Sequence, residues 1–353
     1  MKELCRPKVI KTKIMQTFAT QTKELLPNLA ARKIFGLIKD EMSLVEAEFE
    51  RQARSNIQVI DYLGDYLRSS GGKRVRPALL ILANYAIGGR GSSDNVIRLA
   101  TVMEMLHTAT LVHDDIIDNA DIRRSRTTIN ARFGNHAAVL MGDWLYMSAF
   151  ETALKERSVE ILDILTRLTR KMTEGELIQL TTIGKVDITE DEYFDILTRK
   201  TAFLFAGCCE IGAILGNASF DRQKAMREYG MNLGIAFQLA DDLLDFTSDS
   251  ESLGKAAAAD ILEGKMTLPL IKLVQKDPSI KGDLETIMLD GEYSDETRNR
   301  LMERMRSHDT LSQVREIANS YAETARKNLE ILPQTEYCEA LDAIPNFVID
   351  RSN

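Results

Sequence analysis

The chain has 353 residues, of which 44% are hydrophobic, and it contains only 7 Pro and 20 Gly. This is enough apolar material for a sizeable core, and the dominance of Leu, Ala, Glu, Lys and Arg favours helices. A net charge of −8 and the absence of basic runs with interleaved aromatic residues argue against nucleic-acid binding.

The first residues, 1–27, are basic and rich in Thr and show no clear apolar stripe. We interpret them as a partly ordered N-terminal extension, with an arm that packs on a partner as the alternative. From residue 28 to 353, apolar residues recur at helical spacing and no long alternating strand pattern occurs. The sequence therefore predicts one all-α domain, a helical bundle.

The helices can be placed in chain order from apolar periodicity and from cap residues. Pro77 suits the first position of a helix, and Thr189 with Glu192 forms a capping box. We expect a loop over 88–94 and a polar, Arg-rich connection over 121–135. The expected helices are 29–54, from Pro77 onward, 96–119, 137–155, 158–182, from Thr189 onward, 198–215, 220–245, 268–275 and 295–332.

Two Asp-Asp-x-x-Asp clusters lie in apolar runs that otherwise indicate buried helices. They are Asp114, Asp115 and Asp118, and Asp241, Asp242 and Asp245. At ~100° per residue the outer two aspartates of each cluster share one helical face, while the middle one points partly away. Like charges at this spacing repel unless a cation lies between them, and oxygen ligands favour Mg²⁺ or Mn²⁺. A solvated acidic face is the alternative for one cluster, but two in matching apolar settings favour a metal site.

The segment Gly71-Gly72-Lys73-Arg74-x-Arg76-Pro77 concentrates cations just before a helix start. Glycines let the backbone approach an anion, and a helix N-terminus adds partial positive charge. The spacing is not that of a P-loop, so nucleotide hydrolysis is not implied. An exposed basic turn is the alternative.

Further donors and cations accompany the clusters. The adjacent pair Arg123-Arg124 follows the first cluster and could hold two phosphate groups, or be an ordinary surface pair. His107 lies two helical turns before Asp114. It either donates a hydrogen bond to a phosphate or is a core residue whose hydrogen bonds are satisfied within the fold. Around the second cluster stand Lys200, Thr201, Gln238, Lys255 and Lys265. Two interpretations of Gly175, Glu176 and Gln179 remain equally open: a functional role, or positions on an ordinary polar surface.

This combination suits a substrate with a diphosphate head and an apolar tail. Metal ions that bridge diphosphate oxygens turn the group into a good leaving group. The carbocation left behind survives only where water is excluded and weak dipoles stabilise it.

These motifs resemble the trans-isoprenyl (polyprenyl) diphosphate synthases, over nearly the whole chain from about Ile34 to Arg351. The resemblance implies a helical bundle around a central hydrophobic tunnel, usually a homodimer. It implies Mg²⁺ at both Asp clusters, three ions per active site, with Mn²⁺ possible. The implied substrates are isopentenyl diphosphate and an allylic diphosphate, farnesyl or geranylgeranyl. By the same resemblance, isopentenyl diphosphate is bound by Lys73, Arg76, His107 and Arg124. The allylic diphosphate is bound by Arg123, Lys200 and Lys255, and Lys265 lies in a further motif that matches the family.

The implied reaction is ionisation, condensation and elimination. Thr201 and Gln238 would stabilise the allylic cation, and the departing pyrophosphate would take up the proton. One departure from the family pattern follows Lys255, where alanines occupy positions 256 to 259. Four alanines favour extension of a helix where the family bends a loop.

Product length is set, in this interpretation, by the helix that ends at Asp114. One turn advances ~5.4 Å, about one isoprene unit, so residues four and five before Asp114 form the first gate. These are Thr110 and Ala109, both small, as in bacterial octaprenyl-type members. We expect a long-chain product of the quinone side-chain class. The tunnel floor would then lie deeper, at Trp144, Met147 or Phe150.

Three alternatives stay open. A short-chain synthase is disfavoured by Ala109 and Thr110, and a class I terpene cyclase has no need of a second diphosphate site. A catalytically silent partner subunit typically lacks one Asp cluster, whereas both clusters are intact in this chain.

The four cysteines, at 5, 208, 209 and 338, follow no zinc or thioredoxin spacing, which favours a reduced, cytoplasmic protein. No apolar run approaches the ~18 residues of a membrane span, and no signal peptide is evident.

Overall fold

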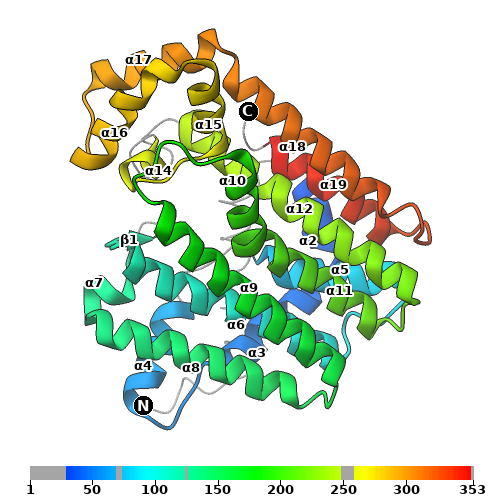
Figure 1. The fold of residues 1–353 in the computed structure, drawn as a ribbon. Coiled ribbons are helices and arrows are strands. Elements are labelled where there is room, and N and C mark those ends of the chain that lie inside the picture. Colours follow the sequence, from blue (N-terminus) through cyan, green and yellow to red (C-terminus); the bar gives the residue numbers. More distant parts are fainter. Residues whose placement is uncertain (1–28, 69–73, 124–125, 248–257, 351–353) are drawn as a thin grey trace. The chain divides into compact units, whose positions relative to one another are not determined.

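The computed structural model describes residues 29–68, 74–123, 126–247 and 258–350 (Figure 1). In these ranges the chain is helical apart from one two-stranded hairpin, so the all-α prediction is confirmed. The extension 1–27 and three predicted site residues, Lys73, Arg124 and Lys255, lie outside the described residues.

The elements follow one another along the chain with short connections. The hairpin pairs β1 (Ile122–Arg123) antiparallel to β2 (Arg126–Thr127). The helices are α2 Leu29–Leu37, α3 Lys39–Gln52, α4 Gln58–Arg68, α5 Val75–Ile87, α6 Asp94–Ile117, α7 Ile129–Phe133, α8 Asn135–Leu154, α9 Val159–Thr182, α10 Glu190–Leu197, η1 Thr198–Ala202, α11 Phe203–Leu215, α12 Phe220–Thr247, α14 Ala259–Leu262, α15 Leu268–Lys276, η2 Pro278–Ile280, α16 Lys281–Asp290, α17 Asp295–Ser307, α18 Thr310–Lys327 and α19 Glu336–Asp350.

The chain divides into two compact units. The first contains the described residues up to 162 together with 211–219 and 333–341. The second contains 163–210, 220–332 and the described residues from 342 onward. The first Asp cluster belongs to the first unit and the second cluster to the second. The expectation of a single domain stays a prediction.

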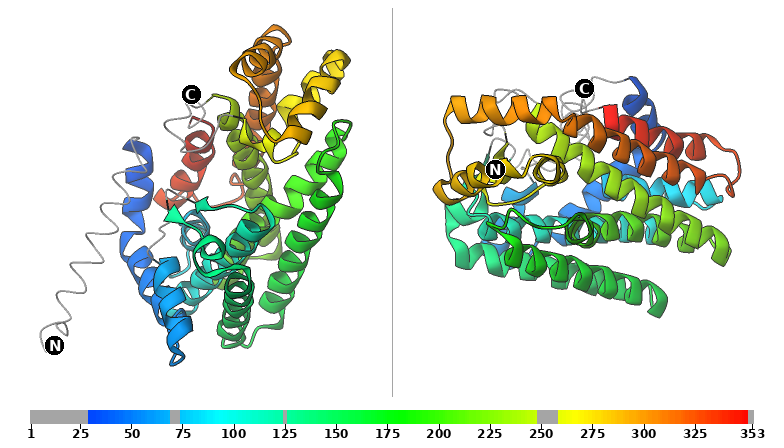
Figure 2. Two further views of the ribbon diagram at one scale, coloured as in Figure 1. Left: turned by 90° about the vertical axis from the view of Figure 1, so that its left-hand side faces the viewer. Right: turned by 45° about the horizontal axis from the view of Figure 1, so that its top comes forward.

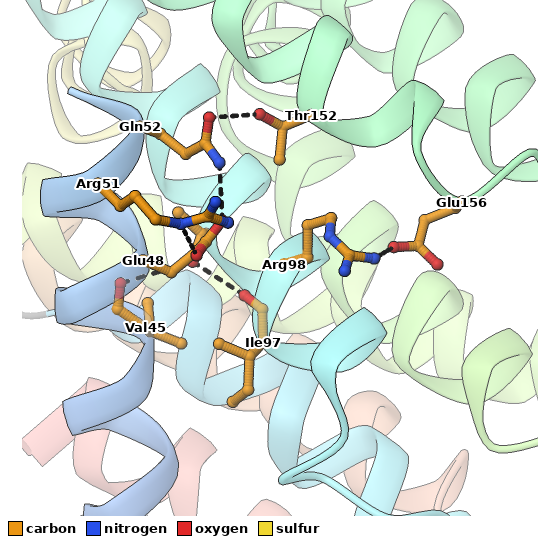
Figure 3. A network of polar contacts seen from close by, with 9 residues as sticks. Val45, Glu48, Arg51, Gln52, Ile97, Arg98, Thr152 and Glu156 are labelled. Atoms are coloured by element: carbon orange, nitrogen blue, oxygen red, sulfur yellow. Dashed lines mark hydrogen bonds and ion pairs between the residues drawn. The ribbon is translucent and has the colours of Figure 1, made fainter. Parts of the chain in front are cut away.

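In the first unit, α6 is the central helix and lies beside α3, α5 and α8 (Figure 1). Its residues from Leu99 to Leu106 are all buried, which explains why this stretch lacks a polar stripe. Figure 3 shows side chains that join the helices: Thr152 of α8 donates to Gln52 of α3 at 3.0 Å, and Gln52 donates to Glu48 at 2.8 Å. The helix that carries the first cluster is therefore held on several sides.

In the second unit, α12 lies beside α18, as both views of Figure 2 show. Two glycines on α12 permit close approach on its other side. A Cβ at Gly230 would lie 2.5 Å from the carbonyl oxygen of Phe205, and a Cβ at Gly234 would lie 2.6 Å from the Cα of Ala202. Any larger residue there would push α12 away from η1 and α11.

The structure corrects several expected boundaries. The helix expected over 29–54 breaks at Ile38, whose φ of −122° is not helical. Pro77 is the third residue of α5 and not the first, a position where the proline still removes no intrahelical hydrogen bond. The helix expected over 295–332 is two helices, because Asp309 adopts a left-handed φ of 54°.

Elements that the sequence did not predict are the hairpin, α4, α7, η2, α16 and α19. The capping box is confirmed: Thr189 Oγ1 accepts from the Glu192 amide at 3.2 Å and Glu192 accepts from the Thr189 amide at 2.8 Å. Cys208 and Cys209 form no disulfide with another described residue and have no exposed surface, as expected for core residues. None of the described helices combines the length and apolarity that crossing a bilayer requires.

Candidate active site

A cavity of about 170 Å³ in the second unit brings most of the residues predicted around the second cluster together. Its polar lining includes Lys200, Thr201, Gln238, Asp242 and Lys265. Its apolar lining is supplied by Ile183, Ile188, Ile196, Leu197 and Met266. Cations, a carboxylate and aliphatic side chains thus share one enclosure, as a diphosphate with an apolar tail would require.

Lys200 and Thr201 lie on η1, a π-helical turn between α10 and α11. Such turns are rare and occur mostly at functional sites, because the wider turn displaces side chains from α-helical positions. Gly175 on α9 faces this turn, and a Cβ there would lie 2.7 Å from the Arg199 Cβ. The π turn was not predicted, because the apolar periodicity of the sequence runs through it.

The Lys200 ammonium is held by α9. Its Nζ lies 2.6 Å from a carboxylate oxygen of Glu176 and also donates to the side-chain oxygen of Gln179. Glu176 and Gln179 therefore contact Lys200, and a functional role for them stays a prediction. Because these partners are acceptors, they fix the position of the ammonium beside the cavity.

Asp242, the middle residue of the second cluster, is 3% exposed and fully engaged by neighbours. Tyr193 donates to its Oδ2 at 2.5 Å, and Gln238 donates to its Oδ1 at 3.0 Å. Burial raises the pKa of Asp242 to about 7, while the bonds from Tyr193 and Gln238 act in the opposite direction. The neighbouring carboxylates Asp241 and Asp245 also raise it, as expected for like charges on one helix.

Asp245 is oriented by the first turn of α14. Its side chain accepts from the amides of Ala259 and Asp260 at 3.0 and 3.3 Å. Ala258 has a left-handed φ of 55°, so a helix cannot continue through it. The expectation that the alanines extend a helix is therefore wrong at Ala258.

Asp260 is a cavity residue that sequence reasoning missed as functional. Burial raises the pKa of its carboxyl well above the usual range, and the charges of Asp245 and Asp242 raise it further. Its position directly after the run of alanines, where the sequence departs from the family pattern, was the available signal. Lys265 is tied to this loop, with its Nζ 2.7 Å from Glu263.

In the first unit the cluster occupies the C-terminal turn of α6. Asp114 and Asp118 are half-buried, whereas Asp115 is 6% exposed and its Oδ1 lies 2.5 Å from the Nε of Arg123. The hairpin thus holds Arg123 on the middle aspartate. The Asn130 side chain donates to the Asp115 carbonyl at 3.1 Å and so satisfies one of the terminal carbonyls of the helix.

Arg74, the cation between Lys73 and Arg76, has a structural position. It is the N-cap of α5 with a left-handed φ of 49°. Its guanidinium lies 2.6 Å from Glu46 on α3 and 2.6 Å from Glu104 on α6, with its side chain only 10% exposed. This three-residue ion cluster, Glu46–Arg74–Glu104, joins the start of α5 to two neighbouring helices.

The remaining predicted residues of the first unit are on α5 and α6. Arg76 lies in the first turn of α5, and His107 lies on α6, where its carbonyl accepts from the Thr110 hydroxyl at 2.7 Å. Ala109 has no exposed surface. Of the proposed floor residues, Trp144 and Phe150 are half-buried, but Met147 is 63% exposed and does not fit a tunnel floor within this chain.

The donor set fits Mg²⁺ in its usual form. Among the described residues no three carboxylate, imidazole or thiol groups form a protein-only metal cage. Mg²⁺ rarely uses such a cage, because it keeps water and substrate phosphates and takes only one or two carboxylates from the protein. The aspartates of each cluster provide such carboxylates.

Comparison with known proteins identifies the family. The family model for polyprenyl synthetase matches residues 57–305. The chain belongs to the polyprenyl synthetase family. The resemblance drawn from the Asp clusters and the basic segment is thereby confirmed, and with it the assignment of the protein as a trans-prenyltransferase.

Individual relatives of this polyprenyl synthetase cover most of its length. It is 36% identical to an octaprenyl diphosphate synthase of Escherichia coli over 90% of this chain and 98% of the relative. It is also 36% identical to a geranylgeranyl diphosphate synthase of Methanosarcina mazei, over 81% of this chain and 88% of the relative. A decaprenyl diphosphate synthase from Rhodobacter capsulatus superposes with a TM-score of 0.85 at 33% identity, over 92% of this chain and 99% of that one.

Proposed function

We propose that this enzyme condenses isopentenyl diphosphate head-to-tail onto an allylic diphosphate and makes a long-chain, all-trans polyprenyl diphosphate of octaprenyl type, a quinone side-chain precursor. The observation that carries the chemistry is the cavity around Lys200, where cations, Asp242 and aliphatic side chains converge. The octaprenyl relative and the buried Ala109 favour the long product.

The residues of the cavity have separate tasks in this proposal. Lys200 and Lys265 hold the oxygens of the allylic diphosphate by charge-assisted hydrogen bonds. The aspartates of the two Asp clusters would hold Mg²⁺, which would neutralise negative charge on the diphosphate that leaves. The oxygens of Thr201 and Gln238 face the allylic cation, and the aliphatic lining excludes water from it. The departing diphosphate takes up the proton, so no separate protein base is needed.

The other predicted residues keep their roles as proposals. Lys73, Arg76, His107 and Arg124 bind isopentenyl diphosphate, and Arg123 and Lys255 assist at the allylic diphosphate. The primer is farnesyl or geranylgeranyl diphosphate. We also retain the single-domain organisation of residues 28–353 and a cytoplasmic location, the latter supported by the burial of Cys208, Cys209 and Cys338.

A homodimer is supported by one face of α8. Leu140, Met147 and Leu154 recur every seven residues and are 68%, 63% and 52% exposed. An exposed apolar stripe of this kind usually marks a protein interface, and a second copy of the same helix would cover it with two-fold symmetry. Sedimentation of the wild type and of Met147→Glu tests this: the variant should shift toward monomer, and an unchanged dimer would exclude this face.

The function is tested by incubating the purified chain with Mg²⁺, farnesyl diphosphate and labelled isopentenyl diphosphate. Dephosphorylated products are then sized. Products beyond geranylgeranyl length, lost on chelation and in Asp241→Asn, are expected. Products that stop at geranylgeranyl length would identify a short-chain synthase, and a chain that makes no product would instead be a silent partner subunit.

A further inference from the structure

A continuous chain of hydrogen bonds runs along the cavity lining from Thr201 to Tyr193, a buried tyrosine that also lines the cavity. Thr201 Oγ1 donates to Gln238 Oε1 at 2.9 Å, and Gln238 Nε2 donates to Asp242 Oδ1 at 3.0 Å. The other carboxylate oxygen of Asp242 accepts from the Tyr193 hydroxyl at 2.5 Å. Three elements, α10, η1 and α12, contribute to this chain.

The chain decides how the Gln238 amide is oriented. Asp242 Oδ2 accepts from Tyr193 and its Oδ1 accepts from Gln238, so the end of the amide that faces Asp242 is the NH₂ group. The amide oxygen is then directed at Thr201. Since both residues line the cavity, the negative end of the amide dipole is held on the Thr201 side. Reversal of the amide would place two acceptors against each other.

Tyr193 is held rigidly enough to anchor Asp242. Its side chain is 7% exposed, and its ring meets Phe194 edge-to-face with centroids 5.4 Å apart. Its helix, α10, starts at the Thr189 capping box and is tied to α15 by the 2.7 Å pair between Glu190 and Lys272. Its hydroxyl therefore fixes the rotation of a carboxylate that has no solvent to compensate for a lost partner.

We propose that Tyr193 is a positioning residue for the prenyl transfer: it locks the Asp242 carboxylate, which in turn keeps the Gln238 amide oxygen aimed toward the allylic cation. This inference rests on the proposed function, because it takes Thr201 and Gln238 as the residues that face the cation. Tyr193 lines the cavity, but in this scheme it acts through Asp242 and not directly on the substrate. Its effect is on the reaction step and not on substrate affinity.

The variant Tyr193→Phe removes only the hydroxyl. Loss of a hydrogen bond to a charged group predicts that kcat falls by about ten- to a hundredfold. The KM of both diphosphates should stay within about threefold, because the side chains that bind them remain. The matched control is Tyr321→Phe, whose ring packs on the same hydrophobic cluster and which should keep wild-type kcat.

A double-mutant cycle tests whether Tyr193 acts through Gln238. Once Gln238→Met has removed the amide, adding Tyr193→Phe should lower kcat no further. Independent, multiplying losses would overturn the inference, as would wild-type kcat in Tyr193→Phe or a KM shift as large as the kcat loss. Should Tyr193→Phe fail to fold, Gln238→Glu tests the same chain, since it cannot donate to Asp242, and wild-type kcat there would overturn the inference. A wild type that makes no product overturns the proposed function itself.

Discussion

The ion cluster Glu46–Arg74–Glu104 gives a quantitative prediction for stability. Replacing Arg74 with Met removes the only cation of the cluster and leaves two carboxylates whose side chains are 20% and 6% exposed. With charge centres ~4 Å apart and an effective dielectric constant of ~20, each lost attraction is worth about 4 kcal/mol before desolvation. Breaking a buried pair from one side typically costs about 3–5 kcal/mol net, because the remaining charge is buried without compensation.

We therefore expect Arg74→Met to lower the free energy of unfolding by about 3–5 kcal/mol, measured by urea titration followed by circular dichroism. Glu104→Gln should cost less, about 1–2 kcal/mol, because Arg74 keeps Glu46 and gains a neutral acceptor. The double variant Arg74→Met, Glu104→Leu should recover most of the loss, since it removes one buried carboxylate together with the cation. An Arg74→Met chain within about 1 kcal/mol of wild type would refute the reasoning, because surface pairs contribute no more than that.

Three further outcomes are expected. Ala109→Tyr should shorten the product toward farnesyl or geranylgeranyl length in the sizing assay, and an unchanged product spectrum would remove Ala109 as the gate. Glu176→Ala should raise the KM of the allylic diphosphate by about tenfold, because Lys200 loses its 2.6 Å partner. A KM equal to that of the wild type would show that the Glu176–Lys200 pair is dispensable. Gly142→Ala should lower the melting temperature, because its Cβ would overlap the His113 ring, whereas Gly36→Ala, with open space around it, should not.

The parts of the fold that follow a helical period were predictable from the sequence. The run from Val96 and the run from Phe220 were placed within a few residues, because long apolar periodicity leaves few other structures. The helix α19 was missed because Pro345 lies inside it, which lowers the local preference for helix. The break at Asp309 was missed because a single left-handed residue leaves no mark on the apolar pattern.

The residues of the candidate site also differ in how far the sequence predicts them. Residues with distinctive chemistry, such as Lys200 and Gln238, were found because charge and donors near an acidic cluster are informative. Tyr193 was not predicted as a site residue, because a tyrosine in an amphipathic helix is typical of the hydrophobic core. Only its contact with Asp242 indicates the second role that we propose for it. Arg74 shows the opposite case, since the sequence grouped it with phosphate-binding cations while the fold uses it as a tether.

The π turn at Thr198–Ala202 acts as a phase shift between two helices that are otherwise continuous. An α-helix advances ~100° per residue, so the one additional residue of a π turn rotates everything downstream by about that angle. Deleting a single residue here would let the turn relax to α-helix and would leave α11 in nearly its present phase, but Lys200 and Thr201 would lose the displacement that the π turn gives their side chains. A deletion elsewhere between Glu190 and Leu215 has no such compensation and would turn the apolar face of α11 away from its neighbours.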